Sequence, residues 1–480
     1  MGGGATRDRP LIAKERQIRD PSRHGGGRGN RARMKIVVTG GAGQLGTILL
    51  RRLAADRTVK SLVSLDIRPP IAVSPKLRYV PADVRDARIE REMAGADAVA
   101  HLAFLVTQLV PRDEMRSVNV EGSKNVFRAA IAAGVPSVVY ASSVAAYGVF
   151  PDHPQPIVEE TPRRYQSSLL YAATKFEVEA HLDELEAAHP GTAFARLRPG
   201  ILAGVRMETA LGRSLAARLV LDPGNPALPW VWDEDVADAA ILAMKGRARG
   251  AFNLVADGLI EPRSFAEAAG FRYLRVPRAV LAGLTRLPQG LTGVPPADPA
   301  WLDEPAELSF SSEKAKRELG WKPRCPTTAD VARRLGEVTR GPMDARLALF
   351  FRLTAFAARR APPMPEAASM TARVHLDIEG QGGGDVGLIA EEGRLSVEPG
   401  EVPRPPTTVI SLKKQLLLEL LAGKTDYATA QLTGRIRIEG EPLAGLVLST
   451  MVAMFRKEGE DPGARGFGAR KLAAWMGRGD

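Results

Sequence analysis

Apolar and amphipathic stretches alternate along the chain from residue 34 to about residue 200. The apolar runs predict strands at residues 35–39, 61–66, 77–80, 97–103, 137–142 and 193–198. Strands separated by helical segments are typical of a parallel sheet that is covered by helices on both faces. The pattern therefore predicts an α/β, doubly wound parallel sheet, followed at 201–340 by a mixed region that is richer in Pro and Trp.

The pattern changes after residue 370. "ARVHLDIEG" and "GRIRIEG" alternate with period two, as half-buried antiparallel strands do, and "EEG" at 391–393 predicts a hairpin turn. Residues 411–424 predict a helix that ends at a glycine. Residues 347–369 predict an amphipathic helix that runs into a Pro-rich linker between the two parts of the chain. We expect a second domain, of α+β type, at 343–460, with a loose tail at 461–480.

Charge is concentrated at the start of the chain. The formal net charge of the 480 residues is +11, and residues 1–33 contain nine basic and three acidic residues. This head has few core-forming residues, so we expect it to be disordered. Because the remaining 34–480 are near neutral for their size, nucleic acid is not an expected partner; RNA binding through the head remains the alternative.

Cysteine content and hydropathy predict the compartment. The single cysteine, Cys325, excludes an internal disulfide and has no metal-like partner in the sequence, so we interpret it as structural. No apolar stretch reaches the ~20 residues that a membrane span needs; the best candidate, 443–455, is too short. We therefore expect a soluble cytoplasmic protein without a membrane span, and no metal site.

A glycine-rich stretch follows the first predicted strand. Gly40, Gly43 and Gly46 have the G-x-x-G-x-x-G spacing in "TGGAGQLG". Small residues let the backbone approach a ligand closely, and the helix that starts at Gln44 and Leu45 would direct its first N–H groups at an anion. This arrangement predicts a phosphate-binding loop.

An acidic residue ends the second strand, twenty residues after Gly46. In a dinucleotide-binding fold, Asp66 would accept hydrogen bonds from the adenine-ribose hydroxyls, and its charge opposes a 2′-phosphate. The sequence therefore favours NAD over NADP. Arg68 opposes this preference, because it could pair with such a phosphate.

Other strand ends offer further cofactor contacts. Asp83 and Val84 follow the third strand and would border the adenine, with a plain turn as the alternative for Asp83. Leu102 and Ala103 of "HLAF" follow the fourth strand beside the expected pyrophosphate, whereas we interpret His101 as a packing residue. Asn119 would hold a structural water or the local backbone.

The motif "YAATK" places Tyr171 and Lys175 four residues apart, on one face of a helix. A phenol titrates near ~10, and a nearby ammonium and an oxidised nicotinamide ring would both lower its pKa. Such a tyrosine can move a proton to or from a substrate oxygen while hydride moves to or from carbon. Ser143, at the end of the fifth strand, would hold the reacting oxygen; Ser142 is the rival by spacing.

At 34–330 the chain resembles the extended short-chain dehydrogenase/reductases, the NAD-dependent epimerase/dehydratase and 3β-hydroxysteroid dehydrogenase group. The matching stretches are "TGGAGQLG", "SLD", "ADVRD", "HLAF", "NVEGSKNV", "SSVAAYG", "YAATK" and "RLRPG". The resemblance implies a Rossmann domain at 34–340 with a small substrate subdomain. It implies that Ser143, Tyr171 and Lys175 are catalytic and that Gly40, Gly43, Gly46 and Asp66 hold the cofactor; we add Tyr171, Lys175 and Pro199 of "RLRPG" to the cofactor contacts. Phe104 and "RPGILAG" depart from the family pattern.

At 370–455 the chain resembles the lipid-binding domain of sterol carrier protein type two. The resemblance rests on apolar spacing in "ARVHLDIEG", "EEGRLSVEPGE", "TTVISLKKQLLLELLAGK" and "TGRIRIEGEPLAGLVLSTMVAMF". A curved sheet with one apolar face under apolar helices can enclose an acyl chain or sterol. The candidate lining residues are Leu416, Leu420, Leu446, Met451, Met454 and Phe455, with plain core packing as the alternative for each.

Together these patterns predict an NAD-dependent oxidoreductase that interconverts a secondary alcohol and a ketone on a sterol-like or acyl-type substrate. The alternatives are a nucleotide-sugar epimerase or dehydratase of the same family and a non-catalytic NAD-sensing or lipid-carrier scaffold. The expected partners are a small hydrophobic substrate or lipid and, in a homodimer, a second copy of the chain.

Overall fold

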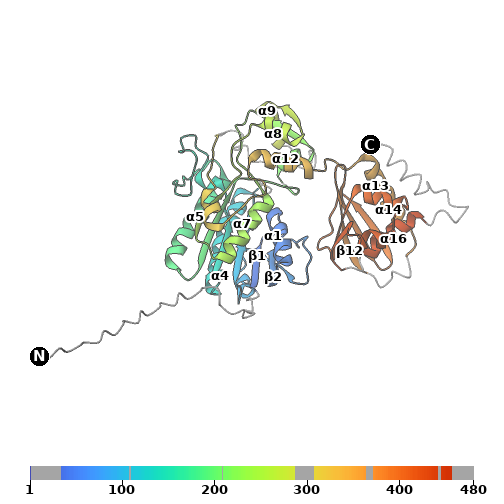
Figure 1. Ribbon diagram of the computed structural model, residues 1–480, viewed down its shortest axis with the longest axis horizontal. Helices are drawn as coiled ribbons and strands as arrows, with labels where there is room; N and C mark the ends of the chain where they lie inside the picture. Colours follow the sequence, from blue (N-terminus) through green and yellow to red (C-terminus); the bar gives the residue numbers. More distant parts are fainter. Residues whose placement is uncertain are drawn as a thin grey trace, which may run out of the picture.

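Two sheets of different kinds organise the molecule (Figure 1). The computed structural model describes Met1 and residues 34–106, 110–207, 209–286, 307–363, 371–441 and 445–456. The strand order is β10-β6-β5-β4-β1-β2-β3 in the first sheet and β14-β13-β12-β15-β16 in the second. Nearly all of the basic head, and the predicted tail at 461–480, lie outside the described residues.

All seven strands of the first sheet are parallel. The six predicted strands are confirmed to within two residues at each end. A seventh, β10, was not predicted because its five residues lie in the mixed region without a long apolar run. The strands are β1 (Met34–Thr39), β2 (Val59–Asp66), β3 (Leu77–Pro81), β4 (Ala98–His101), β5 (Ser137–Ala141), β6 (Ala193–Pro199) and β10 (Gly250–Leu254).

Helices cover both faces of this sheet, as the doubly wound fold requires. Ile36 and Val38 of β1 share one buried cluster with helices α1 (Gln44–Ala55) and α7 (Asp233–Gly246). Val37 lies in the cluster on the opposite face, with α2 (Ile89–Met93), α4 (Gly122–Ala132) and α5 (Leu170–Ala188). Because the strand order reverses between β1 and β4, a crevice is expected outside the carboxyl ends of these two strands.

A smaller lobe follows the first sheet and has its own core. Its strand pairs are β7–β9 and β8–β11, and Trp230 stacks on Phe265 at a centroid distance of 4.7 Å. Its elements are β7 (Ile201–Ala203), α6 (Ala210–Ala216), β8 (Leu219–Asp222), β9 (Trp230–Trp232), α8 (Pro262–Ala269), β11 (Arg272–Arg275), α9 (Arg278–Arg286) and α12 (Thr328–Val338). The short elements elsewhere in this part of the chain are α3 (Arg112–Arg116), η1 (Ser117–Glu121), η2 (Val144–Tyr147) and η3 (Ala315–Leu319).

The second sheet carries helices on one face. Val374, Leu376 and Ile378 of β12 alternate into one buried cluster beneath the helices. The predicted turn at 391–393 is confirmed, because Glu392 and Gly393 have φ of +50° and +74° between paired strands, as a tight hairpin requires. The elements are α13 (Ala345–Ala358), β12 (Ala372–Glu379), β13 (Gly384–Glu391), β14 (Arg394–Pro399), β15 (Thr408–Lys413), α14 (Lys414–Leu421), α15 (Tyr427–Leu432), β16 (Ile436–Gly440) and α16 (Gly445–Arg456).

Two sequence-based expectations for this region are wrong. The predicted helix at 411–424 begins only at Lys414, because residues 408–413 pair with β12 and β16 as strand β15. The Pro-rich stretch near residue 362 does not separate the two domains. Phe350 and Phe351 of α13 belong to the core of the second sheet, so the connection between the domains is the short segment between α12 and α13.

The outward face of the second sheet meets the first domain. Arg51 of α1 pairs with Glu439 at 3.3 Å, and Arg206 approaches Asp385 at 3.8 Å. The Gly382 N–H also donates to the Arg340 carbonyl at 2.6 Å. No helix within the described ranges combines the length and apolar character needed to cross a bilayer.

Phe350→Ala tests the assignment of α13 to the second core. Phe350 is 1% exposed, and truncating a core phenylalanine costs about 3–5 kcal/mol. Calorimetric melting of the full chain should show a large downward shift for the second domain. The matched control is Phe356→Ala on the same helix, which is 57% exposed and should change stability by less than ~0.5 kcal/mol. Equal shifts for the two variants would contradict the assignment.

Candidate functional site

The glycine-rich loop joins β1 to α1 at the carboxyl edge of the sheet. Gly40 has φ of +74°, and a Cβ there would lie 2.5 Å from the Ala103 nitrogen. A Cβ on Gly46 would lie 2.2 Å from the Gly40 carbonyl oxygen. Gly43 caps α1 without a side-chain hydrogen bond, and the first turn contains no acid. The N–H groups at Gln44 and Leu45 therefore remain suited to an anion, and the loop fits a diphosphate.

A fourth glycine completes this loop and was not among the predicted residues. A Cβ on Gly41 would lie 2.2 Å from Ser64 Oγ on the neighbouring strand β2. The sequence shows this glycine in the Gly-Gly pair of "TGGAG", but Gly41 lies outside the three-residue spacing that predicts the loop. Gly41 lets the loop pack directly on β2.

Asp66 lies beside the loop, as the sequence predicts. Its Oδ2 accepts the N–H of Ala42 at 2.9 Å, and its Oδ1 accepts the N–H of Arg68 at 2.9 Å. The next side chain, Ile67, is 69% exposed and offers an apolar surface at the same strand end. A carboxylate next to an apolar surface suits a ribose and its base.

Asp83 and Val84, which follow β3, have different surroundings: the first forms an ion pair and the second is packed in the interior. Arg85 donates to both carboxylate oxygens of Asp83, which lowers the pKa of that acid. Val84 is buried beside Gly122, where a Cβ would lie 2.5 Å from its methyl group. Both residues stabilise this corner. Their contact with an adenine stays a prediction.

The end of β4 closes the other side of the crevice. The Leu102 N–H donates to the Thr39 carbonyl at 3.1 Å, which places Leu102 and Ala103 next to the glycine loop. His101 is buried between Thr39 and Ser123, at 2.7 and 2.9 Å, and burial lowers its pKa to about 3. The imidazole is therefore neutral and structural. Pro199 ends β6 at the same edge of the sheet.

Asn119 uses its side-chain amide on the backbone. Its Oδ1 accepts the N–H of Leu105 at 2.7 Å, and its Nδ2 donates to the Leu105 carbonyl at 3.0 Å. Of the two predicted roles, the structure matches the one in which Asn119 holds the local backbone. Its effect on a cofactor would act through the segment that follows β4.

The two serines after β5 have different partners. Ser142 donates to Glu179 Oε1 at 2.5 Å in the buried interior. Ser143 caps η2 and shares a hydrogen bond with the Tyr171 hydroxyl. Only Ser143 is therefore next to the phenol, in agreement with its predicted place.

Lys175 lies one helical turn from Tyr171 and is 2% exposed. Its Nζ donates to the Ala141 carbonyl at 2.6 Å and to the Tyr140 hydroxyl at 3.2 Å. The same atom lies 3.4 Å from the centroid of the Phe104 ring. Phe104, the residue that departs from the family pattern, thus covers the ammonium and also meets Tyr171 edge-on at 5.8 Å.

The expected lowering of the Tyr171 pKa by Lys175 is not found. Burial raises the pKa of Tyr171 to about 12, and the hydrogen bond with Ser143 acts in the opposite direction. Burial also lowers the pKa of Lys175 well below its usual value, while Glu179 raises it. Phe104 lies over the Lys175 ammonium and packs edge-on against the partly buried Tyr171, and desolvation disfavours the charged form of each group.

A buried ionic network, which was not predicted from the sequence, supports helix α5 with its predicted catalytic residues. Glu179, fully buried in α5, accepts from Arg198 Nε and Nη2 of β6 at 2.9 and 2.5 Å, and from Arg163 at 3.2 Å. Arg198 also donates to the Tyr147 hydroxyl at 2.6 Å. The sequence carries a signal for it, since Glu179 follows Lys175 by four residues, as Lys175 follows Tyr171.

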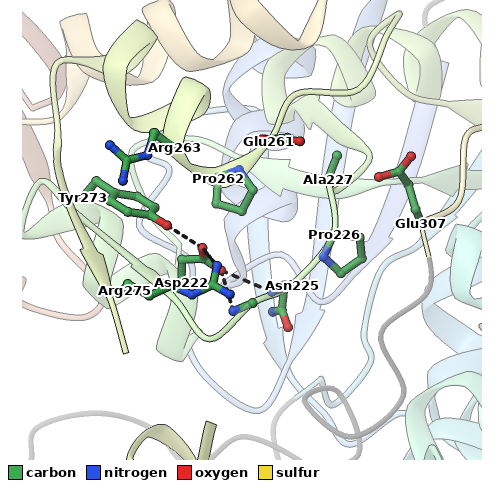
Figure 2. Close-up of a pocket in the computed structure, with 11 residues that line it drawn as sticks. Asp222, Asn225, Pro226, Ala227, Glu261, Pro262, Arg263, Tyr273, Arg275 and Glu307 are labelled. Carbon is green, nitrogen blue, oxygen red and sulfur yellow. Dashed lines mark hydrogen bonds and ion pairs between the residues drawn. The ribbon is translucent and has the colours of Figure 1, made fainter. Parts of the chain in front are cut away.

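A cavity of about 260 Å³ opens in the smaller lobe (Figure 2). Asp222 lies at its floor and accepts from the Tyr273 hydroxyl at 2.6 Å and from Arg275 at 2.5 Å. Its remaining lining residues are Gly224, Asn225, Pro226, Ala227, Glu261, Pro262, Arg263 and Glu307. Ser143, Tyr171 and Lys175 do not line it, so this polar cavity is separate from the catalytic group.

A polar cluster on the second sheet was not expected. Pairing of β12 with β13 brings the ligand atoms of His375, Asp377 and Asp385 within 4.8 Å of one another. Arg340 pairs with Asp377, and Arg206 lies near Asp385. Burial raises the pKa of Asp385, but the hydrogen bond with His375 and the two arginines outweigh it and lower the value to about 2. These cations balance the acids, and the cluster belongs to the interface between the domains.

Three of the predicted lipid-lining residues pack in the second core, namely Leu416, Leu420 and Met451. Leu446, Met454 and Phe455 lie in α16, and their side chains fall outside the described part of the chain.

Family models match two separate stretches of the chain. Residues 36–254 match the NAD dependent epimerase/dehydratase family, and residues 355–453 match the SCP-2 sterol transfer family.

Two relatives and one solved structure are each similar to about 60% of this chain. An uncharacterised protein of Sinorhizobium fredii is 26% identical over 302 residues, which are 60% of this chain and 74% of that protein. A UDP-glucose 4-epimerase of Lactobacillus helveticus is 26% identical over 335 residues, 62% of this chain and 94% of the enzyme. The crystal structure of a dTDP-glucose 4,6-dehydratase of Streptomyces venezuelae, with NAD bound, matches with a TM-score of 0.50 at 21% identity, over 63% of this chain and 96% of that one. That structural likeness shows the fold.

Glu179→Gln tests whether the buried network holds helix α5 in place. Removing one charge leaves Arg198, whose side chain is 5% exposed, without its full partner, and breaking a buried pair costs about 3–5 kcal/mol. Urea denaturation should show this loss. The control is Asp183→Asn in the same helix, which also pairs with Arg163 but is 55% exposed and should cost less than ~1 kcal/mol. Similar losses in both variants would contradict the interpretation.

Proposed function

We propose that this chain, which joins a domain of the NAD-dependent epimerase/dehydratase family to one of the SCP-2 sterol transfer family, oxidises a secondary alcohol or reduces the corresponding ketone on a hydrophobic substrate. It is an NAD-dependent enzyme of the short-chain dehydrogenase/reductase type. The domains would span 34–340 and 343–460. A cytoplasmic location and a homodimer are part of the proposal.

One observation carries the proposal: the predicted catalytic group lies next to the predicted cofactor loop. Ala103 packs on Gly40, and the next residue, Phe104, lies over Lys175 at 3.4 Å. Ser143 shares a hydrogen bond with Tyr171, which lies one turn before Lys175 in the same helix. A substrate oxygen bound between Ser143 and Tyr171 would then lie close to a nicotinamide that continues from the loop.

The chain's residues would manage the proton. When bound, NAD accepts a hydride from the carbinol carbon or, once reduced, returns it to the carbonyl carbon. Tyr171 would donate its phenolic proton to the oxygen of a ketone, or take the proton from an alcohol, while Ser143 orients that oxygen. Burial raises the pKa of Tyr171 to about 12, so the phenol is protonated at neutral pH and can donate its proton to a ketone oxygen.

The second domain supports the choice of a hydrophobic substrate. A domain of the SCP-2 sterol transfer family on the same chain would raise the local concentration of a poorly soluble substrate near the redox site. Leu416, Leu420 and Met451 lie between its sheet and its helices, where a lipid chain would displace core packing.

A nucleotide-sugar substrate is the second candidate. It is supported by the likeness to UDP-glucose 4-epimerases and by the polar cavity of the smaller lobe, where Arg263 and Arg275 could pair with phosphate. The departure of "RPGILAG" from the family pattern argues against it.

A substrate panel separates the candidates. The full chain with NAD would be offered hydroxysteroids, long-chain secondary alcohols and UDP-glucose, and NADH absorbance would be followed together with product analysis for epimerised sugar. We expect NADH from the hydrophobic alcohols, and displacement of a fluorescent fatty acid by the same compounds. Sugar epimerisation without net NADH would favour the second candidate, and no turnover with intact NAD binding would favour a scaffold.

Tyr171→Phe should lower turnover about 10²- to 10⁴-fold without changing the dissociation constant of NAD, because the ring stays in place and only the hydroxyl that carries the transferable proton is removed. The control is Tyr165→Phe, since that ring is 51% exposed and should be dispensable. Steady-state kinetics and titration calorimetry provide the two readouts. Near-normal turnover of Tyr171→Phe would exclude the assigned role.

Asp66→Asn should narrow the preference for NAD over NADP. The amide oxygen can still accept the Ala42 N–H, so the loop keeps its shape, while the charge that opposes a 2′-phosphate is lost. We expect NADP affinity to rise relative to NAD by about tenfold. Asp83→Asn, at the neighbouring strand end, should leave the ratio unchanged. Tighter NADP than NAD binding by the unaltered protein would mean that Arg68 dominates.

A further inference from the structure

A buried carboxyl lies against the cofactor loop from the side opposite to the catalytic helix. Asp233 is the first residue of α7 and is 3% exposed. Its Oδ2 accepts the side-chain N–H of Gln44 at 2.9 Å. Gln44 is also the first residue of α1, whose free N–H groups form the predicted diphosphate site. Asp233 thus contacts the loop from a segment almost 190 residues away.

Asp233 differs from the other acids of its helix in its partners. Arginines pair with those neighbours, at 2.9 Å for Glu234 with Arg52, 3.2 Å for Asp235 with Arg324 and 2.6 Å for Asp238 with Arg324. Within the described part of the chain, the hydrogen bonds recorded for the Asp233 carboxyl come from uncharged donors, the Gln44 amide and the Glu234 backbone. An arginine is therefore available to every acid in this turn except the one that faces the loop.

The surroundings of Asp233 disfavour its charged form. A Cβ on Gly204 would lie 1.8 Å from Oδ2, so the loop after β7 closes tightly over the carboxyl. Burial raises the pKa of Asp233 to about 7, and the negative charges of Glu234 and Asp235 act in the same direction. Gln44 from α1 is neutral and lowers the pKa only in part, and the β7 loop contributes Gly204.

We propose that Asp233 is a positioning residue of the cofactor site and that its neutral form is the one that binds the dinucleotide, so that NAD binding takes up one proton from solvent at this carboxyl. This inference rests on the proposed function, because it concerns the same NAD site. A diphosphate at the start of α1 brings negative charge toward a carboxyl in a dry environment, where repulsion is screened little. Protonation removes the repulsion and leaves Oδ2 able to hold Gln44.

The sign of the pH dependence follows from this linkage. Since the bound diphosphate favours the protonated carboxyl, affinity for NAD is highest below neutral pH and falls as the pH rises through 7. The dissociation constant should rise about tenfold per pH unit in the steep part of the curve. Asparagine at this position cannot ionise, so Asp233→Asn should bind NAD with a nearly constant affinity.

The test is calorimetric titration of the full chain with NAD from pH 6 to 9. We expect the affinity of the unaltered protein for NAD to fall as the pH rises. The Asp233→Asn variant should keep, over the whole pH range, the affinity that the unaltered protein has at pH 6. The control is Asp238→Asn, an acid of the same helix that pairs with Arg324 and is not among the charges that raise the pKa of Asp233; this variant should follow the unaltered protein. Parallel curves for Asp233→Asn and the unaltered protein, or a flat curve for the latter, would overturn the inference.

Two further arms keep the result independent of how well a variant folds. Titration of the unaltered protein in buffers of different ionisation enthalpy should show uptake of close to one proton near pH 8, and no uptake would overturn the inference. ADP-ribose, whose internal diphosphate does not titrate in this pH range, should reproduce the pH dependence and adenosine should not; the same slope for adenosine would also overturn the inference. If the protein does not bind NAD at any pH, the proposed function is overturned together with this inference. That outcome differs from NAD binding whose affinity does not depend on pH, which overturns this inference alone.

Discussion

The close approach of Gly40 to Ala103 is the contact on which the rest of the first domain depends. A Cβ at Gly40 would lie 2.5 Å from the Ala103 nitrogen, so the ends of β1 and β4 can meet only without a side chain. That contact places the glycine-rich loop beside Phe104, and Phe104 in turn covers Lys175. The predicted cofactor loop and the helix that carries the predicted catalytic residues are thus linked through close contacts that tolerate little change in volume.

Burial is the second constraint, and it has opposite consequences in neighbouring places. Glu179 is fully buried but ionised, because Arg198 and Arg163 surround it and hold its pKa below the usual value despite desolvation. Asp233 is almost as buried without an arginine, and its pKa rises to about 7. Two buried carboxyls in one domain therefore have pKa values shifted in opposite directions, because one has arginine partners and the other does not. The first stabilises α5, and the second leaves a titratable group at the predicted cofactor loop.

The second domain contacts the first through side chains as well as through the chain segment that joins them. Its helix α13 packs in its own core, and the chain between the domains is short. The outward face of its sheet meets Arg51 and Arg206 of the first domain, and Arg340 joins the His375, Asp377 and Asp385 cluster. Contact with the first domain explains why His375 is buried on the outer face of the second sheet, since period-two alternation alone would expose it.

The sequence by itself determined the local features. Apolar runs located six strands, "EEG" located a hairpin, and the glycine spacing, Asp66 and the pair Tyr171 and Lys175 marked the candidate site, because each depends on residues close together in the chain. Only the tertiary structure assigned Ser142 and Ser143 to different partners, turned residues 408–413 into a strand, and raised the pKa of Tyr171. These outcomes depend on burial and on contacts such as Gln44 with Asp233, which join distant segments and leave no periodic trace in the sequence.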